Sequence, residues 1–479
     1  MRTSLAAGTV LGLLTACSLA PPYERPQAPV AHDWNSPARS GDASPTAGAT
    51  GWRDFFPDQR MQRLITLALA NNRDLRIAAL KVQEADALYR IQRSSLFPSI
   101  SVFGKQQVEK TPRGVIASSA GTAGGASSAA VISRYYNVGV GFTAYELDVF
   151  GKVRSLDRQA LEQYLGYAET QRSTQISLVA QVASAYLAIA ADLAIIHLTR
   201  DTLNAQVESY DLIRRSMDAG TTTAVALRQA EITVDTARAN LSSYDRQLAQ
   251  DRNTLVQLIG LPLPGDVQFA DELESAPEPI DLAAGLPSDV LANRPDVLAA
   301  EHQLIAANAN IGAARAAFFP SVSLTTNYGT ASAQLSGLFK NGSSAWTFAP
   351  EISLPIFTGG SNAAGLDLAK IQKNSHIAQY EKTIQAAFRE VDDAYAARAT
   401  IDEQLASQRA LVVASRDAYQ LTGMRFRSGV DSFLPVLDAQ RTLYSAQLGL
   451  VNLELLRLQN TATLYKALGG GMKEYKEKL

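Results

Sequence analysis

The sequence contains a single cysteine, nearly balanced charge and few long apolar runs. A single cysteine among 479 residues excludes an intramolecular disulfide and a thiolate metal cluster. The formal net charge of −2 excludes the basic balance of a nucleic-acid-binding protein. After the N-terminal segment we find no run of the roughly 18–20 apolar residues that a membrane-spanning helix needs. Any membrane crossing is therefore expected to use β-strands. The four histidines lack the spacing of metal ligands: His32, His197, His302 and His376.

The one cysteine, Cys17, follows a segment that is typical of exported proteins. Arg2 precedes a short apolar run, and the run ends in Leu14-Thr15-Ala16-Cys17, which has the small residues of a lipoprotein cleavage site. The pattern predicts a signal peptide over residues 1–16 and a lipid, including palmitate, attached at Cys17. Ser18, in place of aspartate, favours sorting to the outer membrane. An ordinary signal peptide with a chance cysteine is the alternative.

The chain contains an internal repeat, and a repeat must be recognised before a fold is assigned. Residues 95–102 read Ser-Leu-Phe-Pro-Ser-Ile-Ser-Val, and residues 317–324 read Ala-Phe-Phe-Pro-Ser-Val-Ser-Leu. Matching segments follow both copies in the same order, including those around Gly220 and Gly429. The sequence therefore predicts one helix–strand unit that is present twice.

Hydrophobic spacing of three and four residues predicts most of each copy to be helical. Two long helices of equal length are expected over 152–219 and 361–428, and Gly220 and Gly429 end them. Shorter helices are expected over 58–97, 225–259, 291–318 and 433–468. Asp431 or Ser432 is a candidate N-cap for the last of these. Proline-rich composition predicts an extended tether over 17–57, and linker segments are expected over 260–290 and 469–479.

Alternation with period two predicts a β-hairpin in each copy, over 98–148 and 319–356. In the first hairpin the apolar face carries Tyr136, Val138, Val140, Phe142 and Ala144. The opposite face is small or polar, which matches a transmembrane barrel strand and argues against a soluble sandwich with its large apolar core residues.

One chain offers four strands, whereas single-chain membrane barrels start at about eight. Several chains must therefore share one barrel. Two chains would give a barrel filled by its own side chains, and three would leave room for a lumen.

The chain resembles TolC-type outer-membrane factors, and most closely the lipidated OprM-like branch that serves tripartite multidrug efflux pumps of the resistance–nodulation–division (RND) class. The segments that carry the resemblance span nearly the whole chain: 14–17, 51–56, 71–75, 146–151, 294–297, 313–321, 354–357 and 436–441. The resemblance implies a mainly α fold with a β-barrel portion. It implies a homotrimer in which a 12-stranded outer-membrane β-barrel continues into a 12-helix periplasmic α-barrel.

The resemblance also implies partners and a function. The partners are a periplasmic membrane-fusion adaptor, an inner-membrane RND pump and outer-membrane lipid. The function is a passive exit duct for antibiotics and other small amphiphilic compounds. The duct is placed in the bacterial outer membrane and extends into the periplasm.

The turns at the ends of the long helices hold the candidate functional residues. By the resemblance, Asp438 faces the pore axis, where threefold symmetry makes one carboxylate into a ring that attracts cations. Pro435 stands where some relatives carry a second acid, so a single ring is expected. Phe426 is expected to brace the closed tip, and Arg425 and Arg427 either pair with carboxylates of neighbouring helices or are solvated. A surface or capping position is the alternative for Asp438.

The same turns are expected to dock onto the adaptor, because glycine allows close backbone approach. The predicted docking residues are Gly220, Thr221, Ala224, Gly429, Val430 and Phe433.

The sequence offers no pattern for catalysis. Gly121, Gly124 and Gly125 lack the lysine and the strand–helix context of a phosphate-binding loop. The carboxylates of Glu390, Asp392 and Asp393 are expected to be solvated or lumen-facing charges. We therefore expect no enzyme activity, metal or cofactor. Two other functions stay open: an exit duct for metal ions or a type I secreted protein, and a structural coiled-coil adaptor without membrane strands.

Overall fold

The computed structural model describes residues 18–31, 33–34, 50–111, 131–265, 267, 269–270 and 293–470. The predicted signal peptide and Cys17 lie outside these residues, as does much of the predicted tether. The chain forms two compact units. Unit 1 comprises Met1–Arg25, Glu84–Leu165 and His302–Ile377, and unit 2 comprises Pro26–Gln83, Gly166–Glu301 and Ala378–Leu479. Each unit thus combines parts of both sequence copies.

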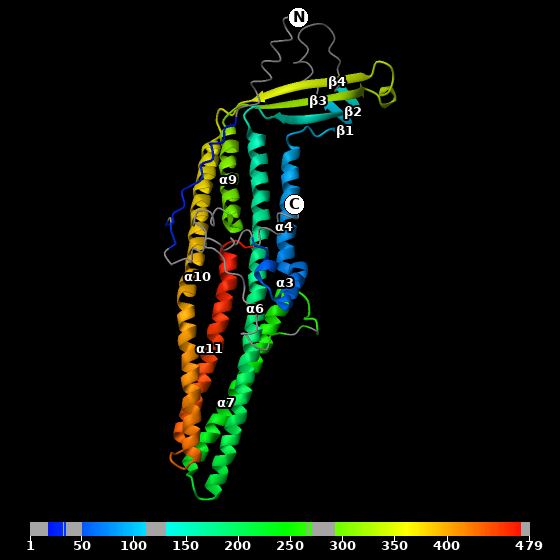
Figure 1. The fold of residues 1–479 in the computed structure, drawn as a ribbon. Helices are drawn as coiled ribbons and strands as arrows, with labels where there is room; N and C mark the ends of the chain where they lie inside the picture. The colour runs from blue at the N-terminus through cyan, green and yellow to red at the C-terminus, as the bar shows by residue number, and fades with distance from the viewer. Residues whose placement is uncertain are drawn as a thin grey trace, which may run out of the picture. The chain divides into compact units, whose positions relative to one another are not determined.

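Helices dominate the described chain, and four strands interrupt them (Figure 1). The helices are α2 (Trp52–Phe55), α3 (Gln59–Asn71), α4 (Arg73–Ser94), α6 (Lys152–Asp218), α7 (Ala224–Ile259), α9 (Pro295–Ala316), α10 (Ser361–Arg427) and α11 (Leu434–Ala467). The strands are β1 (Ser101–Thr111), β2 (Val131–Leu147), β3 (Ser321–Ser332) and β4 (Ser344–Ser353), and a short 3₁₀ helix, η3 (Leu335–Gly337), separates the last two. The long helices α6 and α10 have 67 residues each.

The two hairpins join into one antiparallel sheet of order β1-β2-β3-β4 in unit 1. Val140 pairs with Val102 on one side and Tyr328 on the other, and Tyr328 pairs with Trp346, so these four side chains share a face. The residues that follow Val140 and precede Tyr328, Gly141 and Asn327, share the opposite face. The sheet therefore has one apolar and one small or polar face, as the alternation predicts.

Ala144 was predicted to lie on the apolar face of β2, but a β-bulge changes the alternation at this point. Phe142 pairs with Thr326, but the next apolar-face pair is Tyr145 with Leu324, so β2 contains one extra residue. Ala144 has a left-handed φ of 53° and its N–H donates to Thr325 Oγ1 at 3.0 Å. Beyond the bulge the apolar face continues through Tyr145 rather than Ala144, and simple alternation cannot anticipate this shift.

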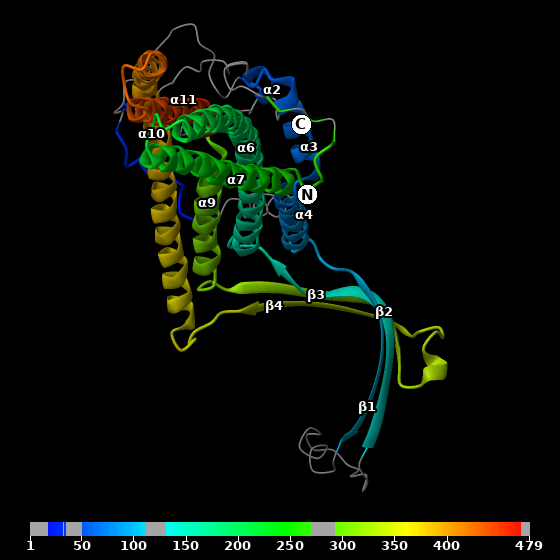
Figure 2. The same ribbon diagram turned by 90° about the horizontal axis from the view of Figure 1, so that it is seen from below.

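Glycines allow β2 and β3 to approach each other closely. Figure 2 shows that the sheet containing these strands is bent. A Cβ added to Gly329 would lie 2.1 Å from the Val138 oxygen, and one added to Gly141 would lie 2.2 Å from the Thr326 oxygen. Real Cβ atoms do not approach other atoms this closely. The close approach of these two strands therefore depends on glycine at these positions.

Both copies leave their helices through the same turn. Phe97 N–H donates to the Ser94 oxygen, and Phe319 N–H donates to the Ala316 oxygen, both at 3.0 Å. The next residue is proline in each copy, which cannot continue a helix. The repeated motif therefore marks the change from helix to strand.

The N-terminal segment lies against α9 within unit 1. Arg315 Nη1 donates to the Leu19 oxygen at 3.0 Å, and Asn308 Nδ2 donates to the Pro21 oxygen at 2.8 Å. Between them, a Cβ at Gly312 would lie 2.8 Å from the Ala20 nitrogen. The chain shortly after Cys17 is therefore held on α9 by two hydrogen bonds and a close backbone contact.

The helix expected over residues 58–97 is two helices, α3 and α4, separated at Asn72. Asn72 Oδ1 accepts from Leu75 N–H at 2.8 Å, which caps the start of α4, and Asn72 Nδ2 donates to the Leu258 oxygen of α7, also at 2.8 Å. The apolar spacing continues across the break, so periodicity alone does not reveal it.

The core of unit 2 surrounds the middle of α6. Tyr186 is fully buried, and its hydroxyl donates to Asp58 Oδ2 at 2.8 Å. Asp58 Oδ1 also accepts from Arg60 N–H and so caps α3. Burial and this hydrogen bond raise the pKa of Tyr186. Tyr465 of α11 stacks on Phe55 with ring centroids 4.3 Å apart.

Helix α6 differs from the expectation that no segment after the N-terminus is apolar enough to span a membrane as a helix. It contains an 18-residue window of mean hydropathy 1.8, apolar enough by length and composition to cross a membrane. The apolar residues of this segment do not form an unbroken run, because they are interrupted by Gln181, Ser184 and Asp192. The high mean hydropathy is therefore not evident from the sequence. However, 67% of the window is buried inside the protein, and burial in a helical core accounts for its composition.

Candidate functional site at the hairpin tips

The two hairpin turns of unit 2 have the same backbone geometry. Gly220 and Gly429 have left-handed φ angles of 73° and 70°. Thr221 N–H donates to the Ser216 oxygen and Val430 N–H to the Arg425 oxygen, at 2.9 and 3.0 Å. These bonds, with those of the glycines themselves, form a Schellman motif at each helix end. Each glycine therefore ends its long helix in a conformation that a residue with a Cβ adopts only with strain.

Arg425 closes the second turn through an ion pair with Asp431. Its Nε and Nη2 atoms donate to the two carboxylate oxygens at 2.5 and 3.0 Å. The hydrogen bond from Arg425 holds the pKa of Asp431 below its ordinary value. The prediction that Asp431 or Ser432 caps α11 is wrong. The helix begins after Phe433 without any side-chain cap, and Pro435 lies in its first turn.

A small apolar core joins the two hairpins at their tips. Phe433 is 5% exposed, and its ring lies 5.1 Å from that of Phe426. The buried members come from α6, α7 and the start of α11: Ile213, Ala230, Phe433, Val436 and Leu437. Phe426 packs against this core, and its role in bracing a closed tip stays a prediction. Phe433 was predicted as a docking residue, but its side chain is buried in this core and is not accessible to a partner.

Arg427 contributes to the electrostatics of the same region. Burial raises the pKa of Tyr419 on α10, Arg427 partly opposes this effect, and Glu208 of α6 adds to it. Arg427 therefore acts on the partly buried phenol of Tyr419, and a carboxylate of the neighbouring α6 acts on the same phenol.

Asp438 lies on the first part of α11 with its side chain 65% exposed. Its Oδ1 atom is 3.9 Å from Arg441 Nη1, one helical turn further on. Arg441 was not predicted as a partner of Asp438, although a spacing of three residues on a helix favours such a pair. A ring built from Asp438 would therefore carry partly balanced charge.

The predicted docking residues other than Phe433 are exposed: Gly220, Thr221, Ala224, Gly429 and Val430. The apolar side chain of Val430 is 61% exposed. These residues form a surface that a partner can reach.

The carboxylates near Glu390 are divided between two environments. Glu390 Oε2 accepts from Nη2 of the buried Arg294 at 2.9 Å, so Glu390 is part of a structural ion pair and not a freely solvated charge. Asp393 lies 3.9 Å from Arg389, with both side chains 75% exposed, which is the solvated arrangement expected. Among the described residues no group of three or more metal-ligating side chains is present.

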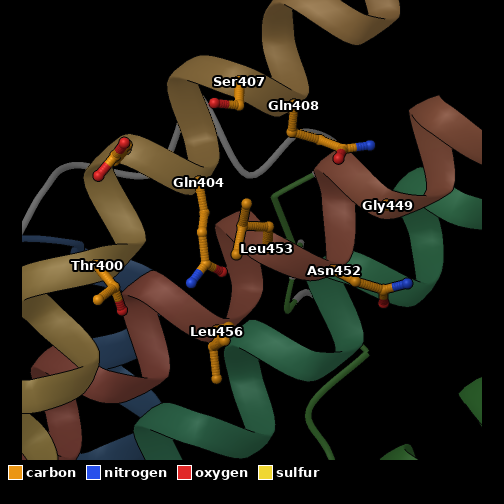
Figure 3. Close-up of a pocket in the computed structure, with 9 residues that line it drawn as sticks. Thr400, Gln404, Ser407, Gln408, Gly449, Asn452, Leu453 and Leu456 are labelled. Atoms are coloured by element: carbon orange, nitrogen blue, oxygen red, sulfur yellow. The ribbon is translucent and has the colours of Figure 1, made fainter.

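A groove between α10 and α11 was not predicted from the sequence (Figure 3). Its volume is about 730 Å³, and polar side chains such as Gln404, Ser407 and Asn452 line it together with Leu453 and Leu456. Gln408 lies along one wall, where its Nε2 donates to the Ala446 oxygen at 2.8 Å and packs closely over Gly449.

The family model described as outer membrane efflux protein matches residues 64–261 and 286–470. The antibiotic efflux pump outer membrane protein ArpC of Pseudomonas putida is 48% identical over 478 residues, covering 99% of this chain and 96% of ArpC. The toluene efflux pump outer membrane protein TtgC, also of Pseudomonas putida, gives the same identity and coverage.

Among solved structures, the open state of the Neisseria gonorrhoeae MtrE outer membrane channel is similar, with a TM-score of 0.86 and 38% identity. The similarity covers 95% of this chain and 99% of MtrE. The predicted fold class, that of the TolC-type channels with a helical and a β-barrel portion, is confirmed. This chain belongs to the outer membrane efflux protein family, and it is an efflux channel of the outer membrane that extends into the periplasm.

Proposed function

We propose that three copies of this chain form one passive exit duct of a tripartite multidrug efflux pump. The observation that carries the proposal is the strand order, in which β1 and β4 each have one edge without a partner strand in the described chain. Lipid does not tolerate unpaired strand edges. Pairing β4 of one copy with β1 of the next removes them, and twelve strands leave a lumen.

The two faces of the sheet support a membrane position. Tyr328 and Trp346 are 65% and 73% exposed on the apolar face, although they are among the largest side chains in the chain. Contact with lipid and with its interface suits aromatic residues in this position. The opposite face, with Gly141, Asn327 and Thr347, suits a water-filled lumen.

The hairpin tips form the proposed gate. Three copies of Asp438 would form a carboxylate ring, and Arg441 would moderate its charge. Phe426 and the Arg425–Asp431 pair hold each tip in the conformation seen here. Opening then requires a change in tip packing, which a partner supplies by binding one state more tightly.

Partners and cargo follow from the relatives. ArpC and TtgC are named for efflux of antibiotics and of toluene, so small amphiphilic compounds are the proposed cargo. The exposed turns at Gly220, Gly429 and Val430 are the proposed contact with a periplasmic adaptor, and an inner-membrane RND pump supplies the energy. The duct itself catalyses nothing, and a lipid on Cys17 anchors the chain to the outer membrane.

Two measurements on the full chain test this proposal. The purified protein should run on SDS gels as a trimer that dissociates on heating, and it should conduct ions in planar bilayers. Produced with an adaptor and an RND pump in a strain without its own channel, it should restore antibiotic and toluene resistance. A monomer that never conducts overturns the duct, whereas a conducting trimer that restores no resistance points to metal-ion or protein export.

A further inference from the structure

Asp192 is a buried carboxylate in the core of unit 2. It is 8% exposed and lies on the same face of α6 as Ile189 and Ile196, which are 0% and 2% exposed. Its Oδ2 atom is buried and has no hydrogen-bond partner among the described residues. A buried carboxylate oxygen without a donor is costly when it carries a charge.

A second carboxylate, Asp251 of α7, acts on Asp192 through a side-chain hydrogen bond and its charge. Leu248, Asp251 and Leu255 are spaced to share one face of α7, and both leucines are buried. Gln247 Nε2 donates to Asp251 Oδ2 at 3.1 Å, which leaves Asp251 as an acceptor toward Asp192. The hairpin between α6 and α7 therefore brings a buried carboxylate, Asp192, together with a half-buried one, Asp251.

No cation balances this pair in the described chain. The α6–α7 ion pair of Arg200 and Asp245 joins exposed side chains at 3.8 Å. On the neighbouring helices, Glu454 of α11 is paired with Arg409 of α10 at 3.3 Å. Among the residues that the structure describes, Asp251 is the one charged group that influences the ionisation of Asp192. A proton is therefore the simplest way to make the contact neutral.

We propose that Asp192 and Asp251 share one proton, which links α6 to α7 in acidic and neutral surroundings, and that its loss at higher pH loosens this hairpin. In the linked form the protonated Asp192 donates to the carboxylate of Asp251, and Gln247 donates to the other side of Asp251. In the ionised form two carboxylates repel each other across the helix contact. Burial, followed by the hydrogen bond to Asp251 and its charge, raises the pKa of Asp192 to about 7.

The direction of the pH effect follows from proton linkage. In the unfolded chain Asp192 titrates near its ordinary pKa of about 3.9. Because the folded pKa is higher, the folded state holds one more proton between roughly pH 4 and 7. The stabilisation from the shared proton is complete below pH 4 and is lost as the pH rises through 7.

The full-length protein in detergent tests the inference through the pH dependence of its thermal unfolding. Wild-type protein should lose several degrees of melting temperature between pH 5.5 and pH 8.5. Asp192→Asn keeps the shape and the donor without an ionisable proton, so most of this loss should disappear. Asp245→Asn, at an exposed position on the same hairpin, should keep the wild-type pH slope. An equal slope in wild type and Asp192→Asn overturns the inference.

Infrared difference spectra give an independent readout. The wild-type protein at pH 6 should show a protonated carboxyl C=O band that disappears on raising the pH and is absent from Asp192→Asn. A band that persists unchanged in Asp192→Asn also overturns the inference, because it would belong to another group.

Discussion

Phe433→Ala tests whether the apolar tip core holds the two helical hairpins together. The wild-type ring is 5% exposed and packs on Phe426, and the Phe433 oxygen accepts from Val436 and Leu437 N–H at 3.1 and 3.2 Å. Truncating a buried phenylalanine costs about 3–5 kcal/mol. The tip core is small and close to solvent, so the lower value, about 3 kcal/mol, applies here.

This loss translates into an opening equilibrium. Each ~1.4 kcal/mol is a factor of ten, so the locally opened tip should become roughly 100-fold more populated. Hydrogen–deuterium exchange of the full-length protein should therefore accelerate by about that factor in peptides that cover residues 210–230 and 426–440, while the core around Tyr186 keeps its protection. Single-channel conductance should rise in parallel, because the same contacts brace the proposed gate.

Val430→Ala is the matched control. Val430 lies in the same turn, but its side chain is 61% exposed, so its removal should change exchange by less than about twofold. If Phe433→Ala leaves exchange at the tip unchanged in a folded protein, or if Val430→Ala has an equal effect, the tip core does not hold the hairpins together.

Three further predictions concern the sheet, the gate and the lipid. Gly329→Ala places a methyl group only 2.1 Å from a backbone oxygen, so the yield of trimer in outer-membrane fractions should fall severely. Gly104→Ala is the control, because its nearest contact is 3.8 Å and it should assemble normally. Equal yields of the two variants would contradict the close approach of β2 and β3. Asp438→Asn should shift the bilayer reversal potential towards weaker cation preference, and an unchanged potential would remove Asp438 from the gate. Cys17→Ser should abolish incorporation of labelled palmitate, and continued labelling would refute the lipid site.

The fold class could be predicted because a few local rules act repeatedly along this chain. Period-two alternation indicates strands, and a small, polar second face separates a membrane sheet from a soluble one. The doubled Phe-Pro-Ser motif marks the passage from helix to strand in both copies, and glycines at equal distances mark the turns. Each of these signals depends on neighbours in sequence, so each is readable without a structure.

The features that were missed depend on contacts between distant segments. Asn72 ends one helix because its amide reaches Leu258 of α7, and nothing near Asn72 in the sequence indicates that contact. Asp431 looks like a cap, but Arg425 offers it a stronger partner on the preceding helix. In the sequence, Phe433 lies in a turn that is expected to be exposed. Its ring is buried because it packs in a core with Ile213 and Ala230 of the first copy of the repeat.

The equal length of α6 and α10 restricts how such a chain can change by insertion or deletion. One added residue advances a helix by about 1.5 Å and turns everything beyond it by about 100°. Such a change in α6 alone would rotate Ile213 away from Leu437. Seven residues bring the same face back to within about 20°. Longer or shorter variants should therefore differ by a number of residues that restores the face, such as seven, in both copies and in their returning helices at once.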